Sequence, residues 1–138
     1  MKALLKSVAF LGLASASQGA LAETVDVNAL HDWQTVEFAS PVNSITSITG
    51  GWSVDTYHYS SVGASGHTGQ AARSLAPWNH YKYDRKYPFG ALLVDIEGMG
   101  HMDVKGPMMF EEPVTSIRIR INDIALGDNK GILTVTFE

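Results

Sequence analysis

Two runs near the C-terminus alternate strictly between apolar and polar residues. They are Ile117–Ile121, which reads Ile-Arg-Ile-Arg-Ile, and Leu133–Phe137, which reads Leu-Thr-Val-Thr-Phe. Because successive side chains of a β-strand point to opposite faces, a period of two predicts strands with one buried face. A helix would scatter these apolar residues around its whole surface. The alternation therefore predicts strands over Thr115–Ile121 and Ile132–Phe137.

Further segments show the same kind of pattern, and turns rich in glycine and proline separate them. The additional predicted strands are Thr24–Asn28, Gln34–Phe38, Ser44–Thr49, Trp52–Tyr59 (less strictly alternating) and Ala91–Glu97. No window shows an amphipathic helix with caps. Short strands separated by turns predict an all-β fold, either an antiparallel β-sandwich or a barrel.

The N-terminus has the features of a secretory signal peptide. Lys2 and Lys6 form a basic region, and the short apolar segment Val8–Ala14 follows it. Gln18–Ala22 ends in small residues that a signal peptidase accepts. We therefore expect residues 1–22 to be a signal peptide and residues 23–138 to form a single secreted or periplasmic domain. The apolar segment is too short to span a bilayer, and no later segment is longer.

Without the predicted signal peptide the chain has 8 basic and 14 acidic residues, and it has no cysteine. An acidic domain lacks the basic surface that nucleic-acid binding needs, so we expect no nucleic-acid partner. The lack of cysteine excludes disulfides, thiol catalysis and thiolate zinc sites. Packing, or a bound ion, must therefore stabilise the domain.

The loop between the last two predicted strands is rich in oxygen-bearing side chains, among them Asp123, Asp128 and Asn129. Asp123 leaves one strand and the other two residues enter the next, so their oxygens can converge on one point. Hard cations such as Ca²⁺ prefer carboxylate, carboxamide and carbonyl oxygens. The same residue types also build ordinary surface turns. The pattern leaves both a calcium site and a plain turn open.

A long irregular stretch over residues 60–89 carries further candidates. His67 and Gln70 can donate hydrogen bonds to sugar hydroxyls and accept them, or they are ordinary polar loop residues. The aromatic residues in Pro77–Phe89 can stack on a sugar or cover the end of the core. Ser65, His67 and a carboxylate can be drawn as a hydrolase triad, but the segment around Ser65 is not a strand–turn–helix nucleophile elbow. We expect no enzyme.

Four segments, in this order, resemble the PA-I type calcium-dependent galactophilic lectins of bacteria. They are Gly50–Asp55, with its Gly-Gly-Trp strand end; His67–Gln70, an H-x-x-Q motif; Phe89–Val94, a G-A-L strand; and Asn122–Gly131, an N-D loop that ends in G-D-N-x-G. The resemblance covers the chain from about Ile45 to the C-terminus. It implies a β-sandwich of jelly-roll, galactose-binding-domain-like character in which Ca²⁺ bridges protein and sugar.

The resemblance also implies a set of calcium ligands. Asp123, Asp128 and Asn129 would bind Ca²⁺ through their side chains, and a backbone carbonyl near Asp55 would add another ligand. In the family a threonine carbonyl completes the loop, but this loop is shorter and lacks the Pro-Gly-Thr segment. Leu126 would have to take that place.

For the sugar, the resemblance implies that His67 and Gln70 hold the hydroxymethyl group and that Asp123 and Asp128 accept hydrogen bonds from ring hydroxyls. It implies a secreted, non-catalytic galactose-type lectin that forms homo-oligomers by family analogy. The stretch from Gln70 to the G-A-L strand is longer here, so its aromatic loop could cover or replace the sugar pocket. Two alternatives stay open: a calcium-stabilised structural or protein-interaction module of the same fold, and a small exported serine hydrolase.

Overall fold

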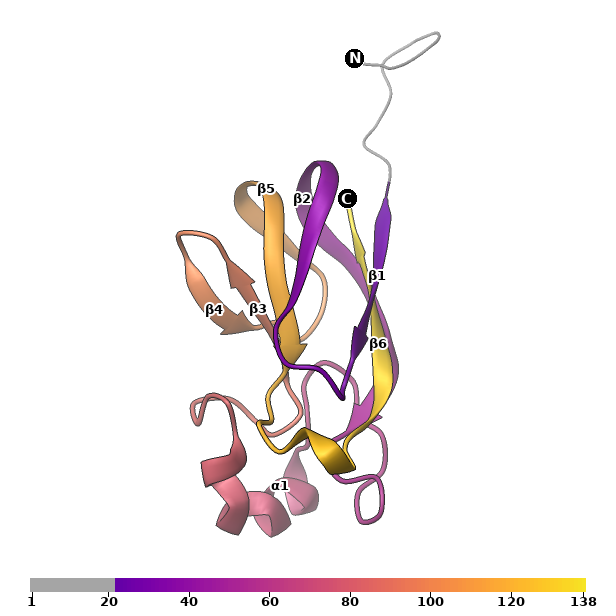
Figure 1. Ribbon diagram of the computed structural model, residues 1–138, viewed down its shortest axis with the longest axis vertical. Coiled ribbons are helices and arrows are strands. Elements are labelled where there is room, and N and C mark those ends of the chain that lie inside the picture. The colour runs from indigo at the N-terminus through magenta and orange to yellow at the C-terminus, as the bar shows by residue number, and fades with distance from the viewer. Residues whose placement is uncertain (1–21) are drawn as a thin grey trace, which may run out of the picture.

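A computed structural model describes residues 22–138, so residues 1–21, nearly all of the predicted signal peptide, lie outside the described part. Six strands form one antiparallel sheet in the order β1-β6-β2-β5-β3-β4 (Figure 1). The strands are β1 (Glu23–Asn28), β2 (Gln34–Ser53), β3 (Leu92–Ile96), β4 (Gly100–Asp103), β5 (Met108–Ile121) and β6 (Lys130–Phe137). Three short helical segments are α1 (Gly69–Leu75), η1 (Ala76–Tyr81) and η2 (Leu126–Asp128). The prediction of an all-β antiparallel fold is confirmed.

Strand β2 belongs to both layers of the molecule. Its first part pairs with β5 as far as Ile45, and its last part pairs with β6 from Ile45 to Ser53. The register shifts between Glu37 and Ser44, where β2 pairs irregularly with β5. Extra residues of this kind bend a strand and increase its twist. One continuous sheet therefore doubles back into a sandwich-like fold, with β1 and β6 on one side and β5, β3 and β4 on the other (Figure 1).

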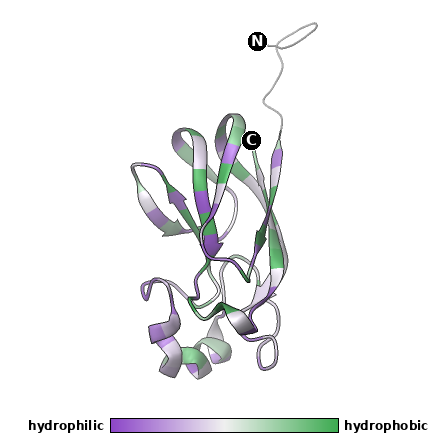
Figure 2. Cartoon of the chain, viewed as in Figure 1, coloured by the Kyte–Doolittle hydropathy of each residue, from purple (hydrophilic) through white to green (hydrophobic). Residues whose placement is uncertain are grey.

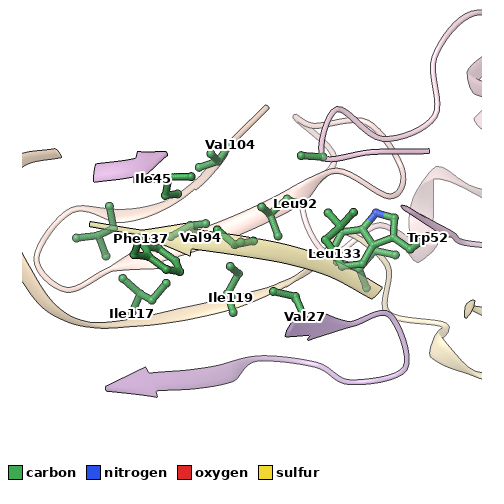
Figure 3. Packing of buried hydrophobic residues seen from close by; sticks show 14 of the residues in the cluster. Val27, Ile45, Trp52, Leu92, Val94, Val104, Ile117, Ile119, Leu133 and Phe137 are labelled. Carbon is green, nitrogen blue, oxygen red and sulfur yellow. The ribbon is translucent and has the colours of Figure 1, made fainter. Parts of the chain in front are cut away.

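The core lies between these two layers, and the alternation of the sequence determines which side chains enter it (Figure 2). In β6 the side chains of Leu133, Val135 and Phe137 are fully buried, whereas the threonines between them are only partly buried. The ring of Phe137 packs against Phe38 of β2 with ring centroids 4.8 Å apart. Figure 3 shows further core residues from several strands, including Val27, Trp52, Val94, Ile117 and Ile119.

Two predictions about the strands were wrong in detail. Gln34–Phe38 and Ser44–Thr49 were predicted as separate strands, but both lie in β2, because irregular pairing bends the strand without ending it. The predicted strand Trp52–Tyr59 ends at Ser53. Beyond it, the carbonyl oxygen of Asp55 accepts hydrogen bonds from the amides three and four residues later, which closes a turn.

The sequence pattern also missed one strand and one helix. Strand β4 has four residues and pairs only with β3 among the strands of residues 22–138. Helix α1 has seven residues, no side-chain N-cap bond, and Leu75 as its buried residue. Such a short helix is stabilised by tertiary packing, which local sequence does not reveal. No helix within residues 22–138 has the length and apolar character needed to cross a membrane.

The helical segments gather at one end of the sandwich, opposite the C-terminus (Figure 1). We call residues 69–89, which comprise α1, η1 and the turn up to Phe89, the aromatic insert. It connects the end of the β2 region to β3 and lies beside the β5–β6 loop, to which it is hydrogen-bonded: the backbone amide of Ile124 donates to the carbonyl of Tyr81 at 2.7 Å. This end of the fold therefore brings together the two segments that carry most of the predicted site residues.

The entry of the chain into β6 depends on Gly131. Its φ is +114°, and an added Cβ would lie 2.3 Å from the carbonyl oxygen of Gly51 and 2.6 Å from Cα of Trp52. We expect Gly131→Ala to lower the free energy of unfolding by about 2 kcal/mol or more, because β6 must move away from β2. Urea denaturation measures this change.

The matched control is Gly127→Ala in the same loop, where an added Cβ meets no atom within 4 Å. It is expected to change the unfolding free energy by less than about 0.5 kcal/mol. Similar losses from the two substitutions would contradict the close approach at Gly131.

Candidate functional site

A pocket of about 610 Å³ opens where the aromatic insert meets the β5–β6 loop. Its lining combines apolar and aromatic side chains with three carboxylates. The lining residues are Val54, Asp55, His58, Tyr59, Leu75, Trp78, Tyr81, Phe89, Asp123, Ala125 and Asp128. Mostly apolar walls with a few polar groups are typical of sites for small ligands.

Asp123 lies two residues after the end of β5 and is only 2% exposed. Its Oδ1 accepts the amide hydrogen of Ala125 at 2.9 Å, and the buried guanidinium of Arg120 donates to its backbone carbonyl at 2.7 Å. Burial raises the pKa of the Asp123 carboxyl to about 7, because removal from water disfavours the charged form. A cation beside this carboxylate would favour its ionised form.

Asp128 and Asn129 stand at the other end of the same loop. The carbonyl of Asp128 accepts the amide hydrogen of Thr56 at 3.2 Å, which joins this loop to the turn that carries Asp55. The buried side chain of Asn129 donates through Nδ2 to the carbonyl of Ala29 at 2.9 Å. Its Oδ1 is buried and has no hydrogen-bond partner among residues 22–138. Buried oxygens without a partner are rare in folded proteins, and a carboxamide oxygen is a suitable ligand for a hard cation.

Asp55 lies across the pocket, in the turn after β2. Its Oδ2 is 2.7 Å from Nδ1 of His58, and its Oδ1 accepts the amide hydrogen of Tyr57 at 3.0 Å. Burial opposes ionisation of Asp55, but the hydrogen bonds from these two residues outweigh it and lower its pKa. The backbone carbonyl of Asp55 already accepts two turn hydrogen bonds. The side chain of Asp55, rather than its carbonyl, is therefore the group that the pocket exposes.

Leu126 does not line the pocket. Its carbonyl oxygen accepts the amide hydrogen of Asn129 at 3.1 Å within the η2 turn, and its side chain packs against the core. The shortened loop has thus closed into a tight helical turn. This geometry does not support the predicted use of Leu126 as a calcium ligand in place of the missing threonine.

His67 and Gln70 also lie away from the pocket lining. His67 is buried; its Nε2 accepts the amide hydrogen of Val54 at 3.3 Å, and its ring packs edge-on against Tyr59. Burial lowers the pKa of His67 and favours the neutral imidazole. Gln70 is exposed on α1 and hydrogen-bonds to side chains of the same helix. His67 contacts two pocket-lining residues, Val54 and Tyr59, without lining the pocket itself. Neither His67 nor Gln70 is placed to hold a sugar hydroxymethyl group in this pocket.

The proposed hydrolase triad has no geometric support. Ser65 is exposed whereas His67 is buried, and no hydrogen bond joins their side chains in the part of the chain that the structure describes. The imidazole of His67 is instead engaged by the Val54 amide.

The sequence interpretation missed Asn122, which is fully buried. Its Nδ2 donates to the carbonyls of Asp84, Tyr87 and Pro88 at 2.9 to 3.1 Å, and its Oδ1 accepts the amide hydrogen of Asp84 at 2.8 Å. Four hydrogen bonds thus fix the end of the aromatic insert to the end of β5. The sequence offered one cue, an asparagine directly after a buried strand, but not the identity of its partners.

The aromatic insert covers part of the core and also lines the pocket, and its predicted stacking on a sugar stays a prediction. Leu75 and Phe89 are buried. Trp78 and Tyr81 line the pocket while remaining 50% and 41% exposed. Rings that stay partly exposed at a pocket can stack on a ligand.

The oxygen atoms of the β5–β6 loop bear on the calcium prediction. Within residues 22–138 no group of three or more His, Cys, Asp or Glu side chains is arranged to hold a metal ion. The predicted set does not require such a group, because Asn129 contributes an amide oxygen. Asp123, Asp128 and the partnerless Oδ1 of Asn129 have the ligand chemistry of Ca²⁺, and further oxygens would have to come from backbone or ligand.

No family model matches the chain, and no curated protein matches it. The resemblance to the galactophilic lectins therefore stays a prediction.

The raised pKa of Asp123 has a consequence for stability. A carboxyl group with a native pKa of about 7 and an unfolded value near 4 binds its proton more tightly in the folded protein. The folded state is therefore destabilised as the pH rises between these two values. We expect Asp123→Asn to raise the unfolding free energy above pH 7 by on the order of a few kcal/mol, and to change it little near pH 4.

Urea denaturation with a chelator present, at both pH values, measures this difference. The substitution keeps an Oδ1 acceptor for the amide of Ala125. Asp103→Asn on β4, outside the pocket, is the control and should show no such pH dependence. A gain for Asp123→Asn that is the same at both pH values would contradict the assigned pKa.

Proposed function

We propose that this protein is a non-catalytic carbohydrate-binding protein that takes galactose-type glycans with the help of Ca²⁺. One observation carries the proposal: Asp123 and Asp128 line the same pocket as the half-exposed rings of Trp78 and Tyr81. Carboxylates accept hydrogen bonds from sugar hydroxyls, and aromatic faces cover the apolar C–H face of the ring.

Asp123, Asp128 and Asn129 Oδ1 are the groups that would hold Ca²⁺. When bound, the ion coordinates neighbouring sugar hydroxyls and so orients the sugar. The chain's own residues perform the other tasks. Arg120 holds the backbone at Asp123, and Trp78 with Tyr81 excludes water from one side of the ligand.

The proposal includes export through the predicted signal peptide to the periplasm or beyond. It also includes self-association, since several weak sugar sites on one assembly raise avidity without new contacts.

A calcium-stabilised interaction module without sugar binding is the second candidate. The positions of His67 and Gln70, both outside the pocket, favour it, because these are the residues that the resemblance assigns to the sugar.

Thermal unfolding separates the two candidates. We expect Ca²⁺ to raise the melting temperature, and galactose to add a further rise only when Ca²⁺ is present, because each ligand binds the folded state alone. Scanning fluorimetry with and without chelator measures both shifts. A rise with Ca²⁺ but none with galactose favours the interaction module, and no shift from either ligand removes both candidates.

A pair of substitutions tests where the ligand binds. Asp128→Asn, at an exposed position, should weaken galactose binding by about tenfold or more in calorimetry, since it removes a charged ligand of the ion. Gln70→Ala should leave the affinity unchanged, because Gln70 lies outside the pocket. The opposite ranking would place the sugar beside α1 rather than in the pocket.

A further inference from the structure

We propose that the pocket prefers sugars that carry a protonated amine, and that the carboxylate of Asp55 receives that amine. The inference rests on the proposed function, because it names the class of saccharide that the same pocket takes.

The first support is the charge of the pocket. Its lining contains three carboxylates and neither lysine nor arginine. The one basic side chain in the lining, His58, is 73% exposed and hydrogen-bonded to Asp55. Apolar walls around charges of one sign focus their field and raise the local concentration of oppositely charged ligands. The pocket therefore attracts cations and repels acidic sugars.

The second support is that two of the three carboxylates are enough to balance the charge of a calcium ion. A divalent ion held by Asp123 and Asp128 is balanced by those two carboxylates, and Asp55 is left over. His58 and Tyr57 each donate a hydrogen bond to Asp55, one to each carboxylate oxygen. A carboxylate oxygen has a second lone pair, so Asp55 can also accept a hydrogen bond from an ammonium group. A neutral sugar offers no charged donor for this second lone pair.

The third support comes from the aromatic walls. Tyr59, Trp78 and Tyr81 line the pocket, and the negative face of an aromatic ring attracts a cation. The protein already contains several such contacts, and in one of them Nζ of Lys82 lies 5.7 Å from the ring centroid of pocket-lining Phe89. Amino sugars combine a C–H face for these rings, hydroxyls for the ion and an ammonium for Asp55. An amino sugar therefore has a partner for the aromatic rings, for the ion and for the carboxylate of Asp55.

Calorimetry in the presence of Ca²⁺ tests the inference with galactose, galactosamine, 6-amino-6-deoxygalactose and galacturonic acid at neutral pH. We expect at least one amino sugar to bind about tenfold more tightly than galactose, as a charge-assisted hydrogen bond allows. Galacturonic acid should bind more weakly than galactose.

Two variants locate the effect. Asp55→Asn should abolish the preference for the amine, so that amino sugars and galactose bind with affinities within about twofold of each other, and it keeps an Oδ1 acceptor for the Tyr57 amide. Asp103→Asn makes the same change of charge on β4, away from the pocket, and should retain the preference. Melting temperatures of both variants confirm that they fold.

The outcomes separate this inference from the proposed function. Galactose binding with no gain for either amino sugar overturns the inference and leaves the proposed function standing. A preference that survives Asp55→Asn overturns the assignment to Asp55. Failure of all four sugars to bind overturns both the inference and the proposed function.

Discussion

The buried amide of Asn122 is the contact on which the pocket depends. It gives hydrogen bonds to three backbone carbonyls of the aromatic insert and accepts one from a backbone amide, and the Asn122 side chain itself is fully buried. Buried polar groups left without such partners are costly, so the insert has one favourable position relative to β5. The Asn122 side chain therefore holds the aromatic wall near Asp123, the next residue along the chain, together with the hydrogen bond from the Ile124 amide to the Tyr81 carbonyl.

Much of the fold could be predicted from local pattern, because alternation alone determines which side of a strand is buried. This holds for β5 and β6, where the buried residues are the ones that the period of two selects. It fails for β2, because the irregular pairing between Glu37 and Ser44 depends on partners far away in sequence. It also fails for α1, whose stability comes from burying Leu75 against the rest of the molecule.

The residues of the site were also predictable from the sequence only in part. Asp123 and Asp128 were selected as loop residues next to strand ends, and Asp55 was selected from the resemblance; the fold brings all three to one pocket. His67 was selected from a short motif, but its direction depends on the backbone around it. Gly66 has a φ of +76°, and a Cβ there would lie 2.5 Å from the carbonyl of Phe89, so this turn packs tightly under the insert and directs the imidazole inward. Spacing in the sequence does not encode that packing.

The shared strand β2 has a consequence for how the molecule unfolds. Its two parts are hydrogen-bonded to β5 in one layer and to β6 in the other, so one continuous strand joins the two layers. Asp55 follows this strand by two residues. We therefore expect a ligand that holds the Asp55 turn in place to slow hydrogen exchange most at the end of β2, where its backbone amides pair with β6.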